Sequence, residues 1–532
     1  MLENKSIIHL LFLFLFFVDS TAQSEYSTDQ YFCKVVNAVS NTPVFYATVK
    51  LNGTNIGVIA DDKGEFRLPL ELFSSDSVII SSIGYRNKRQ DINTLKKGQL
   101  NVIKLSPSVE ALDEVIVVSK KGQPTKLNAK QIIKFALKNI PSNYPNEPFS
   151  YIGYYRDYQQ PIDSIYAILS NQKKDIEYIN LNEGIVEVFD AGFNTDQLSD
   201  DQNQTVVYSY HDNKNFWRDS MLSIPYDNYK NKYLKNVIIP PLGGNELNLL
   251  QLTNAIRNHD KSSFSFVEVL KKNFLRNHKF KLKGINFLDD VPIYEIGISA
   301  KVDRVGMFYY ARGTIFISKK NYAIHKLNYS VYNSSEKELL YTVAIEYAPF
   351  KGKMYLNYIT FNNRFQVNSN QYFKVQKATF DMKDVAFTVY FDKKLNIDFK
   401  NDYRNTIKVK YKKRRIKIQR VAIFSDHIKV FLDKSKLLSI KGFNTNTLLE
   451  DFELSIKGIK DVFGNQIGKM PKLFINQYRE IFVQEVFPGK KIPLGKKPMD
   501  KSLPLSKSSK NSFEEGNKYW ENTPLKQNKI SN

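Results

Sequence analysis

Residues able to do catalytic chemistry are sparse in this chain, and their spacing matches no catalytic motif. A metallocarboxypeptidase site needs a His-x-x-Glu pair, and no histidine has a glutamate three positions later (His9, His211, His259, His278, His325, His427). His-Glu-x-x-His, Cys-x-x-Cys, Gly-x-Ser-x-Gly and phosphate-binding glycine loops are also absent from the sequence. We therefore predict no catalytic residues, no metal ligands and no cofactor. A glycosidase-type carboxylate pair stays open, because its members can come from anywhere in a fold.

Three smaller candidates favour structural roles. Cys33 is the only cysteine, so it cannot form an internal disulfide, and its place in an expected strand indicates an inert thiol. The pairs Asp200-Asp201 and Asp289-Asp290 have the chemistry for calcium, but single Asp-Asp pairs in loops are ordinarily turn formers.

Two basic features have the charge to hold an anion. Arg156 lies in an aromatic strand, where we expect it to pair with a neighbouring carboxylate such as Asp157 or Glu177. Residues 407–420 alternate apolar and basic residues and then turn, which predicts a basic hairpin. The hairpin is either an ordinary solvated face or a patch that holds an anionic polymer. The candidate anionic-surface patch consists of Lys408, Lys410, Lys412, Lys413, Arg414 and Arg415.

The charge balance favours anionic partners. Lysine and arginine number 77 against 54 acidic residues, which gives a net charge of +23. Such a charge attracts anionic surfaces of any kind. Because the basic residues are spread along the chain and not gathered into one block, general over-use of lysine is the preferred explanation of the excess.

An apolar run near the N-terminus predicts export. Residues 7–18 are apolar except for His9, follow Lys5, and precede a small-residue cleavage site at Ala22. The run is shorter than the roughly 20 residues of a membrane anchor, so we predict a signal peptide at residues 1–22. No later stretch approaches that length, so we expect no transmembrane helix after cleavage. Export to the periplasm or the outer membrane excludes nucleic acid and leaves anionic lipid, lipopolysaccharide, polysaccharide or another envelope protein as partners.

The first unit predicts a β-sandwich. Strands are expected at residues 31–37, 45–51, 78–82 and 102–105, with a hairpin at residues 57–70 that turns through Asp61 and Gly64. Six or seven short strands with regular turn signals are typical of a sandwich, here spanning residues 23–110.

Three motifs of this unit resemble the carboxypeptidase regulatory-like domain, a prealbumin-like sandwich of seven strands. They are PVFYATV at residues 43–49, Gly57 with DDKGEF at residues 61–66, and IGY at residues 83–85. The resemblance implies an accessory module of an exported Bacteroidetes protein, without peptidase chemistry. Residues 111–127 are expected to be a linker or edge strand, and the helix and strand that follow are similar to an uncharacterised module of such proteins.

Residues 128–385 predict an antiparallel sheet with helices. Residues 128–140 have apolar side chains at helical spacing, begin with the capping residue Asn128 and end before Pro141. From residue 280 the apolar period changes to two, which predicts an antiparallel meander. The pair GTIFI and YAIHKL resembles strands of periplasmic lipoprotein-carrier folds, in which a curved sheet wraps a helix, so we expect the helix to fill the concave face.

The sequence predicts a further sandwich at residues 386–475 and a tail at residues 476–532. The closing strand and turn at residues 452–467 resemble the end of bacterial immunoglobulin-like domains, which implies such a domain at residues 386–475. Residues 476–532 are rich in Pro, Lys and Ser and are expected to be largely disordered, with Tyr519 and Trp520 docking back or serving as an anchor.

The fold class predicted for the whole chain is mainly β with minor α: a sandwich, a curved antiparallel sheet with helices, and an immunoglobulin-like sandwich. The function expected from these observations is a non-catalytic exported protein of the cell envelope that binds a ligand or acts as a scaffold. Two alternatives stay open, an outer-membrane β-barrel or barrel accessory and an unrecognised hydrolase. Charged residues on both faces of the strands after residue 280 argue against the first alternative.

Overall fold

The computed structural model describes most of the chain but not its first 29 residues. The described residues are 30–54, 56–70, 77–108, 116–118, 124–161, 178–197, 199–218, 232–233, 245–261, 270–288, 290–305, 309–333, 339–368, 373–397, 406–440, 443, 449–462, 464–469, 472–513 and 518–525. The predicted signal peptide lies outside them. Within these ranges, no helix combines the length and the apolar character needed to cross a membrane.

The N-terminal unit is a seven-strand sandwich, which confirms the predicted class. One sheet has the order β4-β1-β7 and the other the order β3-β2-β5-β6. Their inward side chains form one apolar core that includes the buried Cys33. The strands are β1 (Gln30–Asn37), β2 (Thr48–Leu51), β3 (Gly57–Ile59), β4 (Glu65–Pro69), β5 (Ser77–Ser81), β6 (Lys88–Asp91) and β7 (Leu100–Leu105), with the short helix η1 (Ile92–Thr94) after β6.

The expected turn at Asp61 forms, but the hairpin prediction is wrong. The Asp61 carboxylate accepts hydrogen bonds from the backbone N–H groups of Lys63 and Glu65, both at 2.9 Å. Gly64 has φ of +73°, and a Cβ there would lie 2.6 Å from the Val35 carbonyl oxygen. Strand β3 nevertheless pairs with β2, and β4 pairs with β1, so the turn connects the two sheets of the sandwich.

The predicted helix at residues 128–140 is present as α2 (Ala129–Lys138). Asn128 accepts from the Gln131 backbone while the Gln131 side chain accepts from the Asn128 backbone, which is a capping box. The apolar face of α2 packs into the core of the large sheet, as expected. Before this helix, β8 (Ile116–Val118) and β9 (Pro124–Lys126) pair with each other in a two-stranded sheet.

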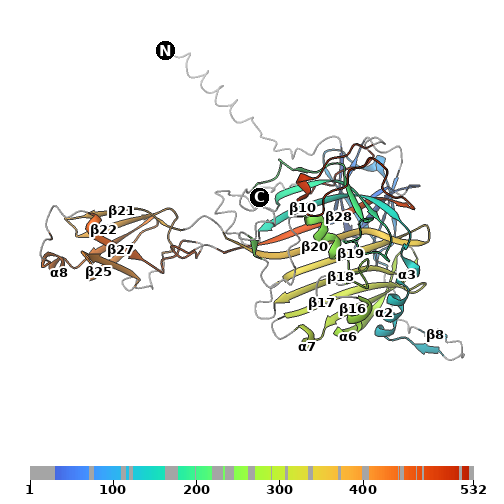
Figure 1. The fold of residues 1–532 in the computed structure, drawn as a ribbon, viewed down its shortest axis with the longest axis horizontal. Coiled ribbons are helices and arrows are strands. Elements are labelled where there is room, and N and C mark those ends of the chain that lie inside the picture. The colour runs from blue at the N-terminus through green and yellow to red at the C-terminus, as the bar shows by residue number, and fades with distance from the viewer. Residues whose placement is uncertain are drawn as a thin grey trace, which may run out of the picture.

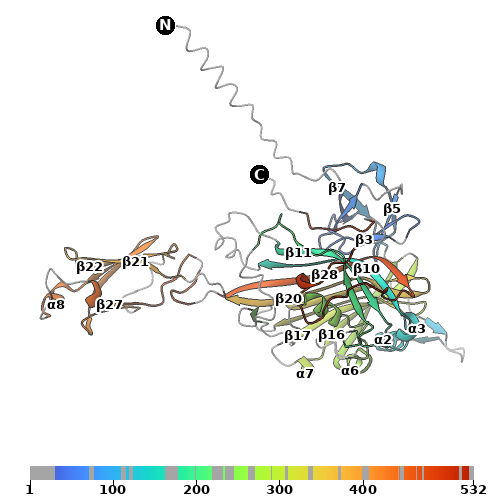
Figure 2. The same cartoon turned by 45° about the horizontal axis from the view of Figure 1, so that its top comes forward.

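A large antiparallel sheet forms the centre of the molecule. Figure 2 shows the N-terminal sandwich against one face of this sheet and α2, α3 and α6 on the side away from it. The sheet has the order β12-β11-β10-β28-β20-β19-β18-β17-β16-β15. Its strands are β10 (Phe149–Pro161), β11 (Ile179–Asp190), β12 (Gln204–Val207), β13 (His211–Asp212), β14 (Lys232–Tyr233), β15 (His278–Leu288), β16 (Val291–Ala300), β17 (Tyr309–Ser318), β18 (Ile324–Asn333), β19 (Leu339–Phe350), β20 (Lys353–Asn368) and β28 (Lys472–Pro488).

Short helices cover one face of this sheet, and buried ion pairs connect α5 and the segment that follows it to the sheet. The Arg479 guanidinium of β28 binds Glu246 of α5, and Arg257 binds Asp190 of β11 through two nitrogens at 2.7 and 2.9 Å. The helical segments are α3 (Ile140–Asn143), α5 (Glu246–Leu252), η2 (Leu270–Phe274), α6 (Leu275–Asn277) and α7 (Val302–Val305).

Strand β28 corrects the expected boundary between sheet and tail. It lies between β10 and β20 in the middle of the sheet, although the sequence places it after the third unit. The segment 476–488 is therefore not part of a tail. Its alternating apolar side chains, such as Ile481 and Val483, pack in the core of the large sheet.

The third unit is a sandwich inserted between β20 and β28. Figure 1 shows it apart from the rest of the molecule. Its two sheets have the orders β21-β22-β26-β25 and β24-β23-β27 and enclose their own apolar core. The unit begins before residue 386, because β21 pairs with β22 and not with the meander. Its elements are β21 (Val375–Asp381), β22 (Ala386–Phe391), β23 (Ile407–Tyr411), β24 (Arg414–Ile416), β25 (Ile418–Ile423), β26 (His427–Leu432), β27 (Phe452–Ile456), α8 (Lys434–Leu438) and η4 (Leu449–Asp451).

The described part of the C-terminal segment is ordered by contacts with both large units, so the disorder expected there is not found. Met499 and Leu505, the latter in η5 (Leu505–Lys507), join the core of the large sheet. Residues 518–525, called the strap below, run along edge strand β4. The strap's Trp520 donates its indole N–H to the Arg67 carbonyl at 3.1 Å, and Asn522 accepts from the Arg67 N–H at 2.9 Å.

Trp520 is the apolar anchor of the strap, since only 6% of it is exposed and it packs in the sandwich core. We expect Trp520→Ala to destabilise the sandwich by about 3–5 kcal/mol, because the substitution empties a buried aromatic site. Urea unfolding and hydrogen exchange of β4 measure the effect. The control is Leu494→Ala, a fully exposed position of the C-terminal segment before the strap, with an expected change within about 0.5 kcal/mol. Equal unfolding curves for the two variants would contradict the anchoring role.

Candidate functional site

The sandwich–sheet interface is where the sandwich packs against the large sheet. Its apolar part consists of one cluster that joins Ile59 of β3 to side chains of β10, β11, β19, β20 and β28. Tyr46 of the sandwich stacks on Tyr358 of β20, with ring centroids 4.5 Å apart. The buried residues of the cluster are Ile59, Ile152, Tyr154, Ile185, Ala344, Tyr358 and Phe482.

Arg156 lies in this interface, and its partners differ from the predicted ones. Its fully buried guanidinium binds Glu480 of β28 at 2.5 Å and lies 3.9 Å from Asp61 of the sandwich. It also donates to the backbone carbonyl of Asn522 in the strap. Asp157 is not its partner, because adjacent side chains of a strand point to opposite faces. The other predicted partner, Glu177, lies outside the described residues.

Acidic groups around Arg156 outnumber the cations. Burial, together with the neighbouring Asp61 and Glu480, raises the pKa of Asp62 to about 7. The Asp62 Oδ1 atom is buried without a hydrogen-bond partner in the described part of the chain. Glu480 accepts a second hydrogen bond, from the Tyr358 hydroxyl at 2.7 Å. The interface therefore holds Asp62 in its protonated form over part of the neutral pH range.

A pocket of about 290 Å³ opens between the two units, and we call it the interface pocket. The sandwich contributes β2, β5 and the loops after them, and the large sheet contributes residues of β15, β18, β19 and β20. Its lining mixes hydroxyl, amide and charged side chains with apolar ones. The lining residues are Thr48, Lys50, Leu51, Gly53, Thr54, Ile79, Ser81, Ser82, Ile83, Asn87, Leu288, His325, Glu346, Tyr347, Ala348, Pro349 and Asn357.

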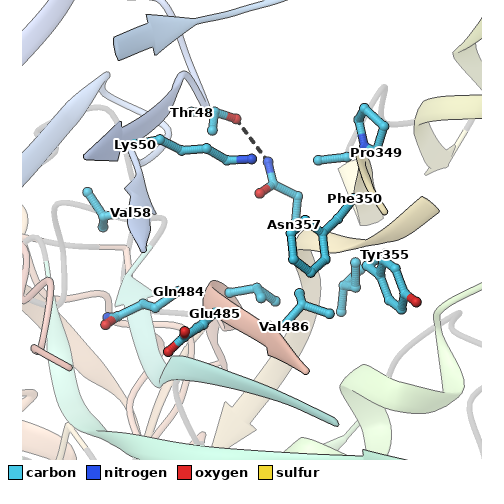
Figure 3. A pocket seen from close by; sticks show the side chains of 14 residues that line it. Thr48, Lys50, Val58, Pro349, Phe350, Tyr355, Asn357, Gln484, Glu485 and Val486 are labelled. Carbon is cyan, nitrogen blue, oxygen red and sulfur yellow. Dashed lines mark hydrogen bonds between the residues drawn. The ribbon is translucent and has the colours of Figure 1, made fainter. Parts of the chain in front are cut away.

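A smaller hollow of about 40 Å³ adjoins this pocket and shares part of its lining. Figure 3 shows Lys50 and Thr48 of β2 extending toward Asn357 of β20. Thr48 Oγ1 accepts from Asn357 Nδ2 at 2.9 Å, so a direct hydrogen bond joins the sandwich to the sheet at this point. Asn357 Nδ2 also donates to Glu346, whose second carboxylate oxygen binds Lys326 at 3.2 Å.

His325 gives the interface pocket a buried polar atom without a partner. The residue is 5% exposed, and its Nδ1 atom has no hydrogen-bond partner among the described residues. Burial lowers the pKa of the imidazole to about 4, so the ring is neutral at physiological pH. A buried imidazole nitrogen of this kind is available to a ligand that enters the pocket.

The other sequence candidates lie away from the interface pocket. Burial raises the pKa of the Cys33 thiol to about 12, which agrees with an inert role. Asp200 accepts from the Gln202 N–H and so forms a turn, as expected for one of the two Asp-Asp pairs. Asp289 lies outside the described residues, and Asp290 has φ of +62° in the turn after β15.

The basic hairpin is present in the third unit as β23, a two-residue turn and β24. All six residues of the candidate anionic-surface patch are exposed. Lys410 binds Glu453 of the neighbouring strand at 2.7 Å, so part of the charge is compensated. The turn residues Lys412 and Lys413 have φ of +43° and +70°. Whether this surface binds an anionic polymer stays a prediction.

The pocket residues Lys50, His325, Glu346 and Asn357 were not identified from the sequence. Thr48 and Asn357 are 309 positions apart, and no motif connects them. The residue three positions after His325 is Asn328, so the sequence gives His325 no catalytic motif. Nothing in the sequence of β2 or of β19 indicates that these two strands lie against each other across the interface.

The comparisons with known proteins identify one module of the chain. Residues 33–117 match the family model of the CarboxypepD_reg-like domain. This finding confirms the resemblance for the N-terminal sandwich and extends it into β8. The CarboxypepD_reg-like domain thus supplies one wall of the interface pocket. None of the curated proteins compared with the chain matches it.

Three solved structures overlap with part of the chain at low similarity. A LolA superfamily protein from Nitrosomonas europaea is 13% identical, with a TM-score of 0.18. A DUF1329 family protein from Desulfovibrio piger is 10% identical, with a TM-score of 0.18, and a putative outer membrane lipoprotein-sorting protein domain from Vibrio parahaemolyticus is 9% identical, with a TM-score of 0.20. Each match covers 44% of this chain and 86% of the other. Similarity of this size does not establish a common function.

The raised pKa of Asp62 has a consequence for stability. The folded protein retains a proton there that the unfolded chain releases near pH 4, so this stabilising contribution is complete below about pH 4 and is lost as the pH rises to about 7. Asp62→Asn should therefore gain at least about 1 kcal/mol relative to the wild type between pH 4 and pH 8. Urea unfolding across this range measures the difference, with the exposed Glu147→Gln as control. A constant difference at all pH values would contradict the assignment.

The basic hairpin predicts salt-sensitive binding. Replacing Lys412, Lys413, Arg414 and Arg415 by glutamine should weaken retention on an anionic polysaccharide column and shift elution to lower salt. The control variant removes the same charge from four exposed lysines of the same unit, Lys374, Lys377, Lys457 and Lys460. Equal shifts in both variants would show that total charge, and not the hairpin, governs retention.

Proposed function

We propose that this chain is a non-catalytic exported protein of the cell envelope that binds an acidic sugar of an envelope polysaccharide or lipopolysaccharide in the interface pocket. The observation that carries the proposal is the pocket itself, with the unpartnered Nδ1 atom of His325 in its lining. Pockets of this size between two units, with apolar walls and a few polar groups, are typical ligand sites.

The lining suits a hydroxylated anion. Ser81, Ser82 and Thr54 offer hydroxyl groups, His325 offers a neutral imidazole, and Lys50 brings a cation. Apolar side chains such as Ile79, Ile83 and Pro349 lie between these groups, and such a mixture fits the alternating polar and apolar faces of a sugar ring. Because Lys326 binds Glu346, the single acidic residue of the lining is compensated.

Three further features support an envelope role. The N-terminal apolar run is typical of a signal peptide, which favours the periplasm or the outer membrane. The CarboxypepD_reg-like domain resembles an accessory module of exported proteins, and here it forms half of the pocket wall. The net charge of +23 would concentrate anionic polymers near the surface before one of their sugars enters the pocket.

Calorimetric titration with glucuronic acid oligosaccharides tests this function. Lys50→Met should weaken binding at least about tenfold, because the cation in the pocket is lost, and should leave weak binding of neutral oligosaccharides unchanged. Lys104→Met is the matched control, since Lys104 is exposed on β7 of the same sandwich and does not line the pocket. The proposal is wrong if the wild type shows no saturable binding, or if both variants bind equally well. Binding only to anionic lipid vesicles would also overturn it in favour of a lipid ligand.

A further inference from the structure

A second group of polar side chains converges where the strap crosses the large sheet. Glu183 lies on β11, His211 on β13 and Glu521 in the strap. His211 Nε2 lies 3.5 Å from Glu521 Oε2 and 3.9 Å from Glu183 Oε1, and the three donor atoms all lie within 4.8 Å of one another. One nitrogen and two carboxylate oxygens thus face a common point.

Hydrogen bonds fix both carboxylates in this orientation. The Oε2 atom of Glu183 accepts from the hydroxyl groups of Tyr154 at 2.7 Å and Thr523 at 2.8 Å, and the Asn213 amide donates to Oε1. The Oε1 atom of Glu521 accepts from Ser209 at 3.4 Å. The Oε2 atom of Glu521, which lies nearest His211, therefore remains available to a metal ion. The hydrogen bonds to the other oxygens hold both side chains in place. Outer hydrogen bonds of this kind orient the ligands of metal sites.

The distances from His211 to the two carboxylates are close to those between metal ligands. Ligands of a tetrahedral Zn²⁺ ion, with bonds of about 2.1 Å, lie about 3.4 Å apart. The 3.5 Å distance from His211 to Glu521 is already close to this value, and a small rotation of the His211 side chain, which is 46% exposed, would shorten its 3.9 Å distance to Glu183. One imidazole and two carboxylates form a donor set that zinc accepts, with a fourth position left for water.

The local charges also favour a cation. In the described part of the chain, neither carboxylate forms an ion pair with lysine or arginine. A divalent ion bound between the two carboxylates would compensate their charges.

We propose that Glu183, His211 and Glu521 bind a divalent transition-metal ion, with Zn²⁺ as the best match, and that the bound ion fastens the strap to β11. This site is separate from the interface pocket and does not depend on the proposed sugar binding. Because Glu521 is next to Trp520, the metal would act on the segment that covers the edge of β4.

Titration of the full chain with Zn²⁺ and Co²⁺ tests the proposal. The chain should bind one ion, and Co²⁺ should give the intense visible absorption of a tetrahedral site. Saturating Zn²⁺ should raise the melting temperature, since a ligand that binds only the folded state stabilises it. His211→Ala should weaken the affinity at least about tenfold and remove the Co²⁺ spectrum.

Two matched variants separate metal binding from general damage. Glu521→Gln keeps the size of the side chain but removes one anionic ligand, so it should also lose at least about tenfold in affinity. Tyr519→Phe removes a contact between strap and sheet, the hydrogen bond to Glu485, and should keep the Zn²⁺ affinity and the Co²⁺ spectrum. If His211→Ala and the wild type bind both ions alike, or if neither binds, His211 serves only as an ion-pair partner of the two carboxylates and the proposal is wrong.

Discussion

The buried guanidinium of Arg156 is the constraint on which the assembly of this molecule depends. A fully buried charge needs compensating partners, and removing one partner of such a pair typically costs about 3–5 kcal/mol. Here the partners come from three separate parts of the chain: Glu480 from β28, Asp61 from the sandwich and the Asn522 carbonyl from the strap. The sandwich, the sheet and the strap therefore compensate one charge together.

This constraint also connects segments that are distant in the sequence. Arg156 and Glu480 are 324 positions apart, because the third unit is inserted between β20 and β28. The central strand of the sheet can pair only after that unit has been synthesised. Contacts between residues so far apart in the sequence form late, and they lower the rate of folding. The separate core of the third unit allows it to fold during this interval without the sheet.

The local elements of the fold could be predicted from the sequence, because their signals are local. The capping box at Asn128, the Asp61 turn and the meander from β15 to β20 all follow from spacing within about 20 residues. The partners of the strands could not be predicted in the same way. Residues of β3 and β4 alternate as a hairpin would, yet the turn carries the chain from one sheet to the other. Strand β28 follows a sandwich and precedes a Pro-rich segment, so nothing near it indicates a place between β10 and β20.

The candidate site was the least predictable part, because its residues also come from segments that are distant in the sequence. The sequence predicts that a helix fills the concave face of the sheet, and α2 and its neighbours do fill that face with buried apolar side chains. The interface pocket lies on the opposite side, where polar residues of the CarboxypepD_reg-like domain meet β18, β19 and β20. A packed core has no room for a ligand, whereas two rigid units that touch at only part of their surfaces leave polar space between them. The accessory module therefore contributes to binding through its fixed position on the sheet, and that position depends on Arg156, Tyr46 and the strap.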